Sequence, residues 1–382
     1  MQALTGTKIM DLSMNLPGPY MTWLLAALGA EILKIENPQA GDPTRAIESN
    51  PIHPFPLFGL VNSNKKSMTL NLKHAAAKKI FIKLLSKYDI LVEGFRPGVM
   101  EKLGLGYDIL RKIQPRIIYV SISGFGQSGP SRLKAAHDLN YQAITGCFHA
   151  ASISGGIPQV PSIPIADLAG GSLFGLFGLL AAVIQRERTG VGQQVDISLS
   201  DGAFSMNILG LCHSLALKRN PGKADNFLCG TQPFYNIYQT VDDRYITLGA
   251  VEFKFWKNFC ITVEREDLIS RQFGGAPVIE IVSKIFRTRP LSDWSQIFEN
   301  VDACVEPILS TEEAMTSSTR FQATSMQNEI GDSSSLLPFR LPGSPLKEYS
   351  PAPELGQHNV QTLAGIGFSN KNIEDLKTQG AI

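Results

Sequence analysis

The feature that most constrains the fold is an alternation of strand-like and helix-like segments over the first two hundred residues. Short apolar stretches such as "KIMDLS", "EILKIE", "DILVEGF" and "IIYVSIS" alternate with longer helical patterns such as "YMTWLLAALGA", "HAAAKKIFIKLLSKY" and "GVMEKLGLGYDILRKI". Parallel strands require crossover connections, and helices usually supply them. The alternation therefore predicts an α/β fold in which helices cover a mostly parallel sheet. The stretch 37–66 lacks this periodicity and is expected to form a long loop.

The rest of the chain predicts a second, smaller unit. A strand "QQVDISLS" and a helix from Asp201 to about Ala216 continue the first pattern, and "KRNPGKADN" follows as a candidate boundary. Two strand patterns flank Asp242 and Asp243, which predicts a hairpin. Because 382 residues exceed what one simple core accommodates, a small α+β domain is expected over about 222–325. Its helices are expected near 253–262, 276–287 and 291–300.

Charge and cysteine usage exclude several classes of function. A formal net charge of +1 gives no global field that would attract nucleic acid or an anionic membrane. The five cysteines are scattered without a C-x-x-C pair, so neither a disulfide framework nor a metal site is expected, and a reducing compartment fits best. The N-terminal "MQALTGTKIMDLS" lacks the basic and apolar regions of a signal peptide, so a cytoplasmic location is expected.

Two motifs suggest a membrane span and a dinucleotide site, but the residues around them argue against both interpretations. The segment 168–184 is uncharged over 17 residues, the lower limit for a membrane span, and a buried helix is the favoured interpretation. "GFGQSG" over 124–129 matches G-x-G-x-x-G, but Pro130 follows and no apolar helical stripe begins there. A dinucleotide fingerprint requires a helix to start inside the motif. Nicotinamide or flavin binding is therefore not expected.

Three acidic or imidazole groups are candidates for proton transfer. His137 lies in "HDLNY", Asp167 precedes two glycines in "PIADLAGGS", and Glu252 follows a strand in "GAVEFKFW". Both carboxylates could simply cap helices. Glycines weaken a helix relative to alanine, so Gly170 and Gly171 indicate a close approach by another backbone or by a ligand. Asp167 could then act as a base or a nucleophile.

Basic residues near one another in sequence could hold a polyanion, although solvated surface charge is the alternative. They are Arg45, Lys65, Lys66, Lys73, Arg96 and Lys102. No P-loop signature accompanies them.

Taken together, the motifs resemble one family over nearly the whole chain. "LPGPY", "KSMTLNLK", "EGFRPGVMEKLGLGYDIL", "SGFGQSGP", "HDLNYQAITG", "ADLAGG" and "RTGVGQQVDISLSDG" are similar to the family III CoA-transferase (CaiB/BaiF-type) superfamily. Within it, "HDLNY", "GAVEFKFW" and "DACVEPIL" look like the α-methylacyl-CoA racemase branch. The chain departs from that branch at Asn37, where arginine is frequent, and at Ala136, where glycine is usual.

The resemblance implies an architecture that spacing alone does not reveal. It implies a large Rossmann-like CoA-binding domain built from both chain ends, 1–221 and 326–382, with the small domain 222–325 inserted between them. It also implies an interlocked homodimer in which Glu252 of one subunit approaches His137 of the other.

The resemblance further implies a 2-methylacyl-CoA racemase in which His137 and Asp167 are the two bases and Glu252 orients His137. Coenzyme A would be part of the substrate, and no separate cofactor is expected. The residues expected to line the acyl and enolate site are Leu16, Asp138, Asn140, Tyr141 and Gly170. Those expected to hold CoA are Asn37, Leu70, Asn71, Leu72, Lys73, Arg96, Lys102 and Ala136.

Two alternatives stay open at this point. A family III CoA-transferase would use Asp167 as a nucleophile and would not need His137. A non-catalytic protein would bind acyl-CoA without exchanging its α-proton.

Overall fold

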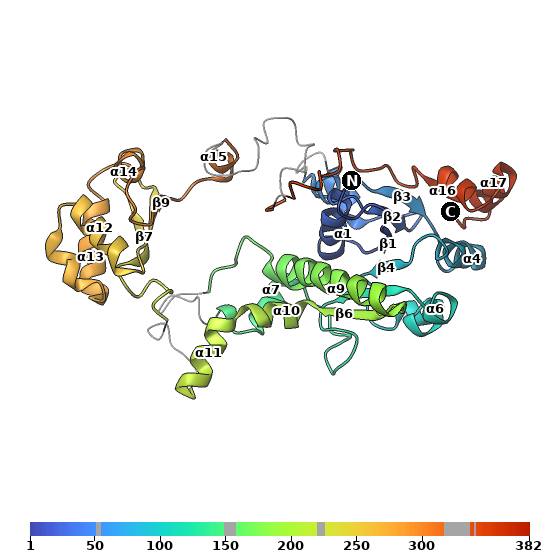
Figure 1. The fold of residues 1–382 in the computed structure, drawn as a ribbon, viewed down its shortest axis with the longest axis horizontal. Coiled ribbons are helices and arrows are strands. Elements are labelled where there is room, and N and C mark those ends of the chain that lie inside the picture. The colour runs from blue at the N-terminus through green and yellow to red at the C-terminus, as the bar shows by residue number, and fades with distance from the viewer. Residues whose placement is uncertain (51–54, 149–157, 220–225, 317–336, 340) are drawn as a thin grey trace. The chain divides into compact units, whose positions relative to one another are not determined.

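A computed structural model describes residues 1–50, 55–148, 158–219, 226–316, 337–339 and 341–382 (Figure 1). The contacts divide the chain into two compact units. Unit 1 comprises Met1–Thr145, Pro161–Met206 and Phe321–Ile382, and unit 2 comprises Gly146–Val160 and Asn207–Arg320. The expected domain borders near 221 and 325 lie outside the described residues. The division assigns 207–219 to unit 2, and the helix in this stretch, α11 (Ile208–Leu217), buries none of its residues.

Unit 1 is built on a six-stranded parallel sheet of order β3-β2-β1-β4-β5-β6, so the predicted α/β class is confirmed. Its strand order changes direction between β1 and β4, and crevices at such a switch point are the usual ligand sites of open α/β sheets. The strands are β1 (Lys8–Leu12), β2 (Glu31–Glu36), β3 (Lys66–Thr69), β4 (Ile90–Glu93), β5 (Ile118–Ser123) and β6 (Gln194–Ser198).

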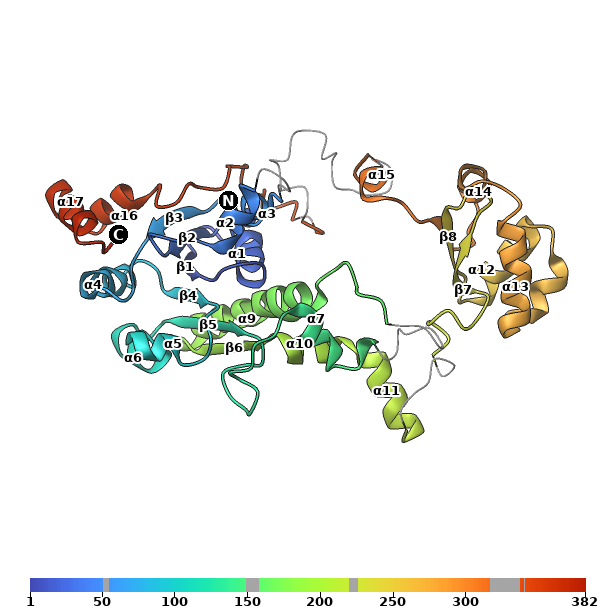
Figure 2. The same cartoon turned by 180° about the vertical axis from the view of Figure 1, so that it is seen from behind.

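Helices cover both faces of this sheet, as Figures 1 and 2 show from opposite sides. One face carries α1 (Pro17–Ala27) and α9 (Phe174–Thr189), whose apolar residues pack with Ile9, Val92 and Val120. The other face carries α4 (Ala75–Leu84), α5 (Val99–Leu103), α6 (Tyr107–Ile113), α16 (Asn359–Gly365) and α17 (Asn370–Thr378). Because both faces are covered there, every residue of the central strands β4 and β5 is buried and most of these residues are apolar.

The C-terminal segment completes unit 1 beside the edge strand β3. The backbone N–H of His358 bonds to the carbonyl of Ser67 at 2.9 Å, and the Thr69 N–H donates to Asn359 Oδ1 at 2.8 Å. Leu363, Ile373 and Leu376 are buried in the same core as β1, β2 and β4. Both ends of the chain therefore belong to one hydrophobic core, and an exposed sheet edge is covered.

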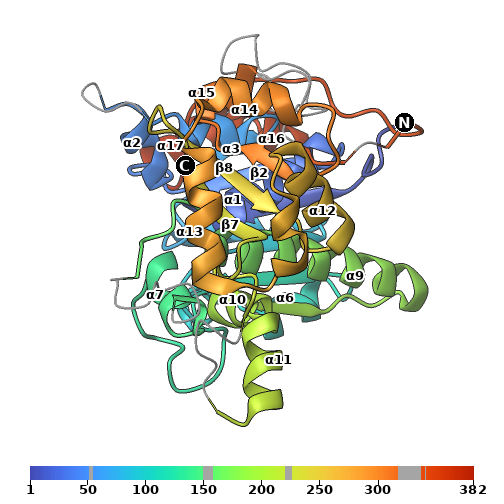
Figure 3. The same cartoon turned by 90° about the vertical axis from the view of Figure 1, so that its left-hand side faces the viewer.

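Unit 2 is a smaller α+β assembly. Its antiparallel sheet has the order β7-β8-β9, from β7 (Tyr235–Gln239), β8 (Tyr245–Gly249) and β9 (Val305–Pro307). The predicted hairpin is confirmed, and Asp243 takes a positive φ of 58° in its turn. Figure 3 shows α12 (Phe253–Thr262), α13 (Gly275–Phe286) and α14 (Leu291–Phe298) gathered around these strands, near the three expected helical ranges.

Three local expectations were wrong. The stretch 37–66 is not a continuous loop, because it contains α2 (Pro43–Glu48), α3 (Leu57–Asn62) and the first residue of β3. Helices of six residues are too short to show an apolar period. "GVMEKLGLGYDILRKI" forms two helices, α5 and α6, because Gly104 takes a positive φ of 74° between them. The helix expected over 201–216 is likewise divided into α10 (Leu199–Met206) and α11.

The apolar helical stretch is buried on one face only. The π-helical turns η1 (Ala166–Leu173) lead directly into α9, and together they form a segment apolar and long enough to cross a membrane. A third of that segment's apolar window is buried, including Leu179 and Ala182. Leu173 and Phe177 are exposed. The expectation of a buried helix therefore holds only for the side that faces the sheet. The core helix of a globular protein can be as long and as apolar as a membrane span.

Candidate active site

His137 and Asp167 lie in the same region of unit 1 although thirty positions separate them in the sequence. His137 is the N-cap of α7 (Asp138–Ala143), and its backbone N–H donates to Asn140 Oδ1 at 3.0 Å. Asp167 lies in the first turn of η1, whose N-cap is Ile165. The two side chains are near enough for the charge of His137 to act on the Asp167 carboxyl. The fold thus brings together the two groups that the sequence suggested as bases.

The surroundings of Asp167 raise the pKa of its carboxyl toward neutral pH. Burial and then the neighbouring Asp138 carboxylate raise its pKa, His137 acts in the opposite direction, and the net pKa is about 6. Asp138 is held in place because its Oδ1 accepts the Asp167 backbone N–H at 2.9 Å and its Oδ2 accepts Gln142 Nε2. A like charge that is fixed beside a half-buried acid is a direct cause of a raised pKa.

Gly170 serves close packing between two helices. A Cβ at Gly170 would lie 2.8 Å from the Leu199 carbonyl oxygen and 3.0 Å from the Ala203 nitrogen. Gly202 of α10 presents the reciprocal contact, since its Cβ would lie 2.5 Å from Gly170 Cα. The glycine that the sequence suggested for a close approach therefore admits the backbone of α10. This contact fixes η1, and with it Asp167.

Tyr141 lies between the acid–base pair and the loop after β5. Its hydroxyl donates to the Ala136 carbonyl at 2.9 Å, and its ring meets Phe125 edge to face at 5.3 Å. Burial raises its pKa, Asp167 and Asp138 raise it further, and Arg96 lowers it. Ala136, expected among the CoA contacts, is thus placed beside Tyr141 on the acid–base side.

The "GFGQSG" loop is explained by the same contact. A Cβ at Gly124 would lie 2.3 Å from the Tyr141 hydroxyl oxygen, and Gly126 has a φ of 77°. The chain continues into turns after Gly129, and no helix starts inside the motif. The motif therefore serves the packing of Tyr141, and the doubt about a dinucleotide fingerprint is confirmed.

Leu16 and Asn140 occupy defined places around this pair. Leu16 is the N-cap of α1, and the next residue, Pro17, accepts a hydrogen bond from Ser172 of η1 at 2.6 Å. Leu16 therefore lies where α1 begins against the Asp167 helix. Asn140 uses its amide oxygen to hold the His137 backbone, so that oxygen is engaged in capping.

A cavity of about 210 Å³ opens at the carboxyl ends of β1 to β4. Five of the eight residues expected to hold CoA line it: Asn37, Leu70, Asn71, Leu72 and Lys73. The sequence reasoning missed the other lining residues, which are Leu12, Met14, Ile35, Glu36, Gly41, Asp42, Phe95, Val99 and Leu103. Their position just after parallel strands was a usable signal, because ligands of such sheets bind at that edge.

The basic residues fall into two groups. Arg96 and Lys102 are exposed beside the cavity, next to its lining residues Phe95 and Leu103. Lys65 was wrongly grouped with them, since it is buried and its Nζ lies 3.2 Å from Asp11 Oδ2. Lys66 pairs with Glu31 at 3.3 Å.

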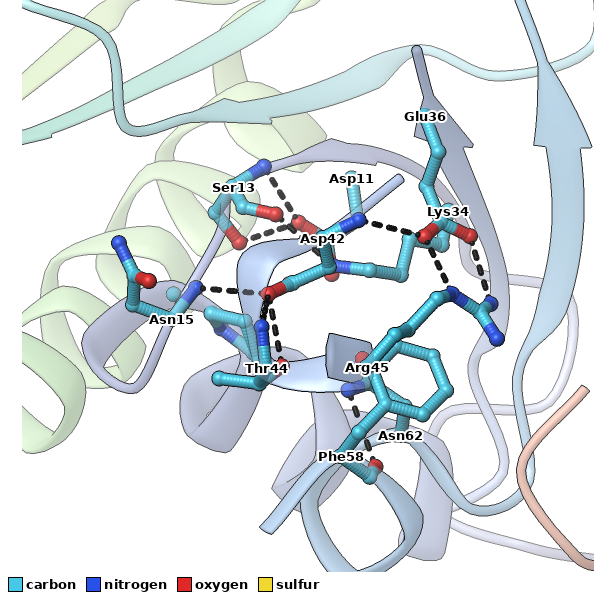
Figure 4. Close-up of polar contacts among 12 residues, drawn as sticks. Asp11, Ser13, Asn15, Lys34, Glu36, Asp42, Thr44, Arg45, Phe58 and Asn62 are labelled. Atoms are coloured by element: carbon cyan, nitrogen blue, oxygen red, sulfur yellow. Dashed lines mark hydrogen bonds and ion pairs between the residues drawn. The ribbon is translucent and has the colours of Figure 1, made fainter. Parts of the chain in front are cut away.

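Arg45 was also a wrong candidate for phosphate binding. Its Nε and Nη2 donate to the two oxygens of Glu36 at 2.8 and 2.9 Å (Figure 4). Nη2 also donates to the Pro353 carbonyl at 3.0 Å. Glu36 also accepts the Ser67 hydroxyl at 2.7 Å and the Asp42 N–H at 3.1 Å. An acid at the end of β2 is the usual ribose acceptor of a dinucleotide site. Because four donors of the protein already bond to the Glu36 carboxylate, it does not serve as a ribose acceptor here.

Glu252 belongs to unit 2 and is described there alone. It is the N-cap of α12, and its exposed carboxylate makes no hydrogen bond to the first turn of that helix. Capping by its side chain therefore does not account for this residue. Among the described residues, no group of three or more His, Cys, Asp or Glu side chains could hold a metal ion.

The comparisons with known proteins identify the family of the chain. Residues 4–359 match the model of CoA-transferase family III. The chain is 32% identical to human "Alpha-methylacyl-CoA racemase", over 100% of this chain and 97% of the relative. It is also 32% identical to "Acetyl-CoA:oxalate CoA-transferase" of Acetobacter aceti, over 90% and 88% of the two chains. A CaiB/BaiF family protein from Brucella suis shares the fold with a TM-score of 0.79, at 23% identity and covering 96% of this chain and 99% of its own. The chain therefore belongs to CoA-transferase family III.

Proposed function

We propose that the protein interconverts (R)- and (S)-2-methylacyl-CoA thioesters by 1,1-proton transfer. The observation that carries the proposal is the meeting of His137 and Asp167 at the starts of α7 and η1. One base would take the α-proton from one face, the electron pair would pass to the thioester oxygen as an enolate, and the other conjugate acid would protonate the opposite face. Placed acid–base groups typically contribute about 100- to 10,000-fold.

The environment of Asp167 supports proton transfer over nucleophilic attack. A pKa of about 6 lies near neutral pH, where the group can both accept and return a proton. Both roles need the ionised carboxylate, but only proton transfer also requires the group to give a proton back, which a pKa near neutral pH allows. Backbone N–H groups near Asp138 would stabilise the enolate oxygen, and one such donor is typically worth ~3 kcal/mol.

The substrate contacts follow from the same placement. The cavity with Asn37, Leu70, Asn71, Leu72 and Lys73 would hold CoA, and Arg96 and Lys102 would meet its phosphates. Leu16, Tyr141 and the Gly170 turn would border the acyl group. Coenzyme A is then part of the substrate, and side chains alone carry the transferred protons.

In a homodimer, the partner subunit would supply the third group of the site. Glu252 of the partner subunit would orient His137, as the third member of a triad does. The exposed apolar face of α9, with Phe174, Phe177 and Ile184, supports association, because large apolar patches on a soluble chain mark interaction sites. Light scattering should give a dimer, and a fully active monomer would refute this part. The location we propose is cytoplasmic.

CoA transfer is the second candidate, because a transferase relative shares the same 32% identity as the racemase relative. There the Asp167 carboxylate would attack the thioester carbonyl and CoA thiolate would leave. The thiolate would then attack the aspartyl anhydride, release the first acid and leave an aspartyl-CoA thioester for the acceptor.

One experiment separates the candidates. Each pure 2-methylacyl-CoA enantiomer is incubated with the enzyme in D2O, with and without added oxalate or succinate, and analysed by mass spectrometry. The racemase assignment predicts one deuterium at the α-carbon without any acceptor acid. CoA transfer to the added acid without deuterium uptake would assign the transferase, and binding with neither reaction would indicate a non-catalytic binding protein.

A further inference from the structure

Two loops that border the cavity are joined by a buried ion pair. The Lys34 Nζ lies 2.9 Å from Asp42 Oδ2, and neither side chain is exposed (Figure 4). Lys34 belongs to β2, whereas Asp42 ends the loop that follows this strand and caps α2. A fully buried ion pair requires further hydrogen bonds to offset the cost of removing two charges from water.

Two of those further hydrogen bonds come from Thr44 of α2, and the others lead to the cavity-forming loops. The Lys34 ammonium donates to the Ser13 carbonyl at 2.8 Å. Asp42 Oδ1 accepts the Asn15 N–H at 3.3 Å, so the same carboxylate grips the loop after β1. The backbone N–H of Asp42 donates to Glu36, which is at the end of β2. The pair therefore ties the loop after β1 to the loop after β2.

The tied loops hold residues from both halves of the proposed substrate site. Met14 and Asn37 line the cavity on the CoA side. Asn15 has a positive φ of 65°, a strained conformation for a residue with a side chain, and Leu16 follows it at the start of α1 against η1. A strained residue persists only where its surroundings hold it. Asp42 supplies a direct bond to that residue.

We propose that Asp42, charged and held by Lys34, is a positioning residue that fixes the separation of the CoA-binding loops and of Leu16. The inference rests on the proposed function, because it assigns the cavity to acyl-CoA. Preorganised loops bind ligand without the cost of ordering them. Loss of the pair should therefore weaken CoA binding more than it slows proton transfer.

The test compares wild type with Asp42→Asn, Lys34→Met and the double variant. Asparagine keeps an oxygen for Thr44 and Asn15 but removes the charge that Lys34 requires. Asp42→Asn should raise the calorimetric Kd for CoA and the KM for acyl-CoA about tenfold, with kcat changed less than about threefold. The double variant should resemble either single variant, because the pair acts as a unit.

A matched control comes from an ion pair at the opposite edge of the sheet. Arg186 Nη1 lies 3.0 Å from Asp89 Oδ2, just before β4 begins, far from the cavity lining. Asp89→Asn should lower the melting temperature and leave the Kd for CoA unchanged. If Asp42→Asn does not fold, Thr44→Val removes one hydroxyl donor to Asp42 and should raise Kd about threefold.

A second readout does not depend on the ligand. Deuterium uptake by peptides that span 13–16 should be faster in Asp42→Asn than in Asp89→Asn, because the side chain at 42, no longer held by Lys34, holds the Asn15 N–H less firmly. If wild type binds CoA and Asp42→Asn binds it equally well, the inference is overturned. If wild type does not bind CoA at all, the proposed function fails instead, and unchanged uptake at 13–16 would then overturn the positioning role independently.

Discussion

Unit 1 contains two polar regions that shift the pKa of a carboxyl group in opposite directions. Asp11 is fully buried with Lys65 and Lys34, and although burial alone would raise its pKa, the two ammonium groups hold the pKa down at about 2. Asp167 is half-buried beside another carboxylate, and its pKa rises to about 6. Around Asp11, each buried charge has an opposite charge beside it. Around Asp167, the ionised carboxylate that is present at neutral pH lies beside a like charge, which reduces the stability of the fold.

The difference separates two uses of charge. Paired ions at β1 and β2 hold loops and helices together, and Lys65 alone reaches Asp11, Thr22, Asn62 and the Pro19 carbonyl. Asp167 has a backbone N–H fixed by Asp138, but its carboxyl faces like charge. Acids with raised pKa values gather at catalytic sites for this reason. We therefore expect substitutions in the first region to reduce stability, and substitutions in the second to reduce activity.

The largest effect on stability should come from Asp11→Asn. Removing one partner leaves Lys65 buried without its counter-ion, which typically costs about 3–5 kcal/mol. The folded pKa of Asp11 is lowered, so its contribution is present above the unfolded pKa of about 3.8 and is lost as pH falls toward about 2. Chemical denaturation at pH 7 and pH 2.5 should show a loss that shrinks at the lower pH. An equal loss at both values would contradict the ion-pair explanation.

A smaller loss should follow from Gly170→Ala. The added Cβ would meet the Leu199 carbonyl at 2.8 Å and Ala203 at 3.0 Å, and overpacking of this kind costs about 1–3 kcal/mol. Because Gly170 fixes the helix that carries Asp167, kcat should fall as well. The exposed helical Ser205→Ala is the control and should change neither quantity. Unchanged stability and kcat in Gly170→Ala would mean that α10 moves aside freely.

Asp167→Asn should instead increase the free energy of unfolding at neutral pH. The folded pKa is raised, so the folded protein loses stability as pH rises from about 4 to about 6, and the full cost is present at neutral pH. Removing the acid should therefore stabilise the protein by about 1–2 kcal/mol at pH 7.5, and by little near pH 3.5. Thermal unfolding at the two pH values measures this. A destabilised variant at pH 7.5 would show that Asp167 serves the fold.

The smallest effect is expected for Asp138→Asn. Asparagine keeps an oxygen for the Asp167 N–H, and the Gln142 amide can turn to accept the new N–H2 group. Losing the like charge should lower the Asp167 pKa, and the rising limb of the pH–rate profile should move to lower pH. A limb that stays in place would mean that burial alone sets the pKa.

Much of the architecture could be predicted from sequence because parallel strands buried on both faces produce long apolar runs. The network of buried ion pairs, in contrast, could not be predicted from the sequence. Lys34 in "EILKIE" resembles a solvent-facing residue of an alternating strand, yet it is wholly buried. In a sheet covered on both faces, a charge inside a strand requires a buried partner. The partners, Asp42 and the Ser13 carbonyl, belong to separate loops, so no local pattern reveals them.

The candidate site shows a similar division. His137, Asp167 and the cavity residues from Leu70 to Lys73 could be proposed from motifs, because each motif is short and contiguous. Lys65 and Arg45 were misplaced since sequence alone does not show whether a cation is satisfied by the protein. The role of Asp138 beside Asp167 depends on a contact across 29 positions, and only the fold establishes it.

The central claim is that His137 and Asp167 serve opposite faces of one α-carbon. The most direct measurement is chiral analysis of deuterated thioester after each pure enantiomer is incubated in D2O with His137→Gln or Asp167→Asn. Both variants should lose racemisation, because every turnover needs both bases. Each should still exchange one enantiomer with retained configuration, and the two variants should exchange opposite enantiomers. If both exchange the same enantiomer, or if His137→Gln racemises at the wild-type rate, the two-base account is wrong.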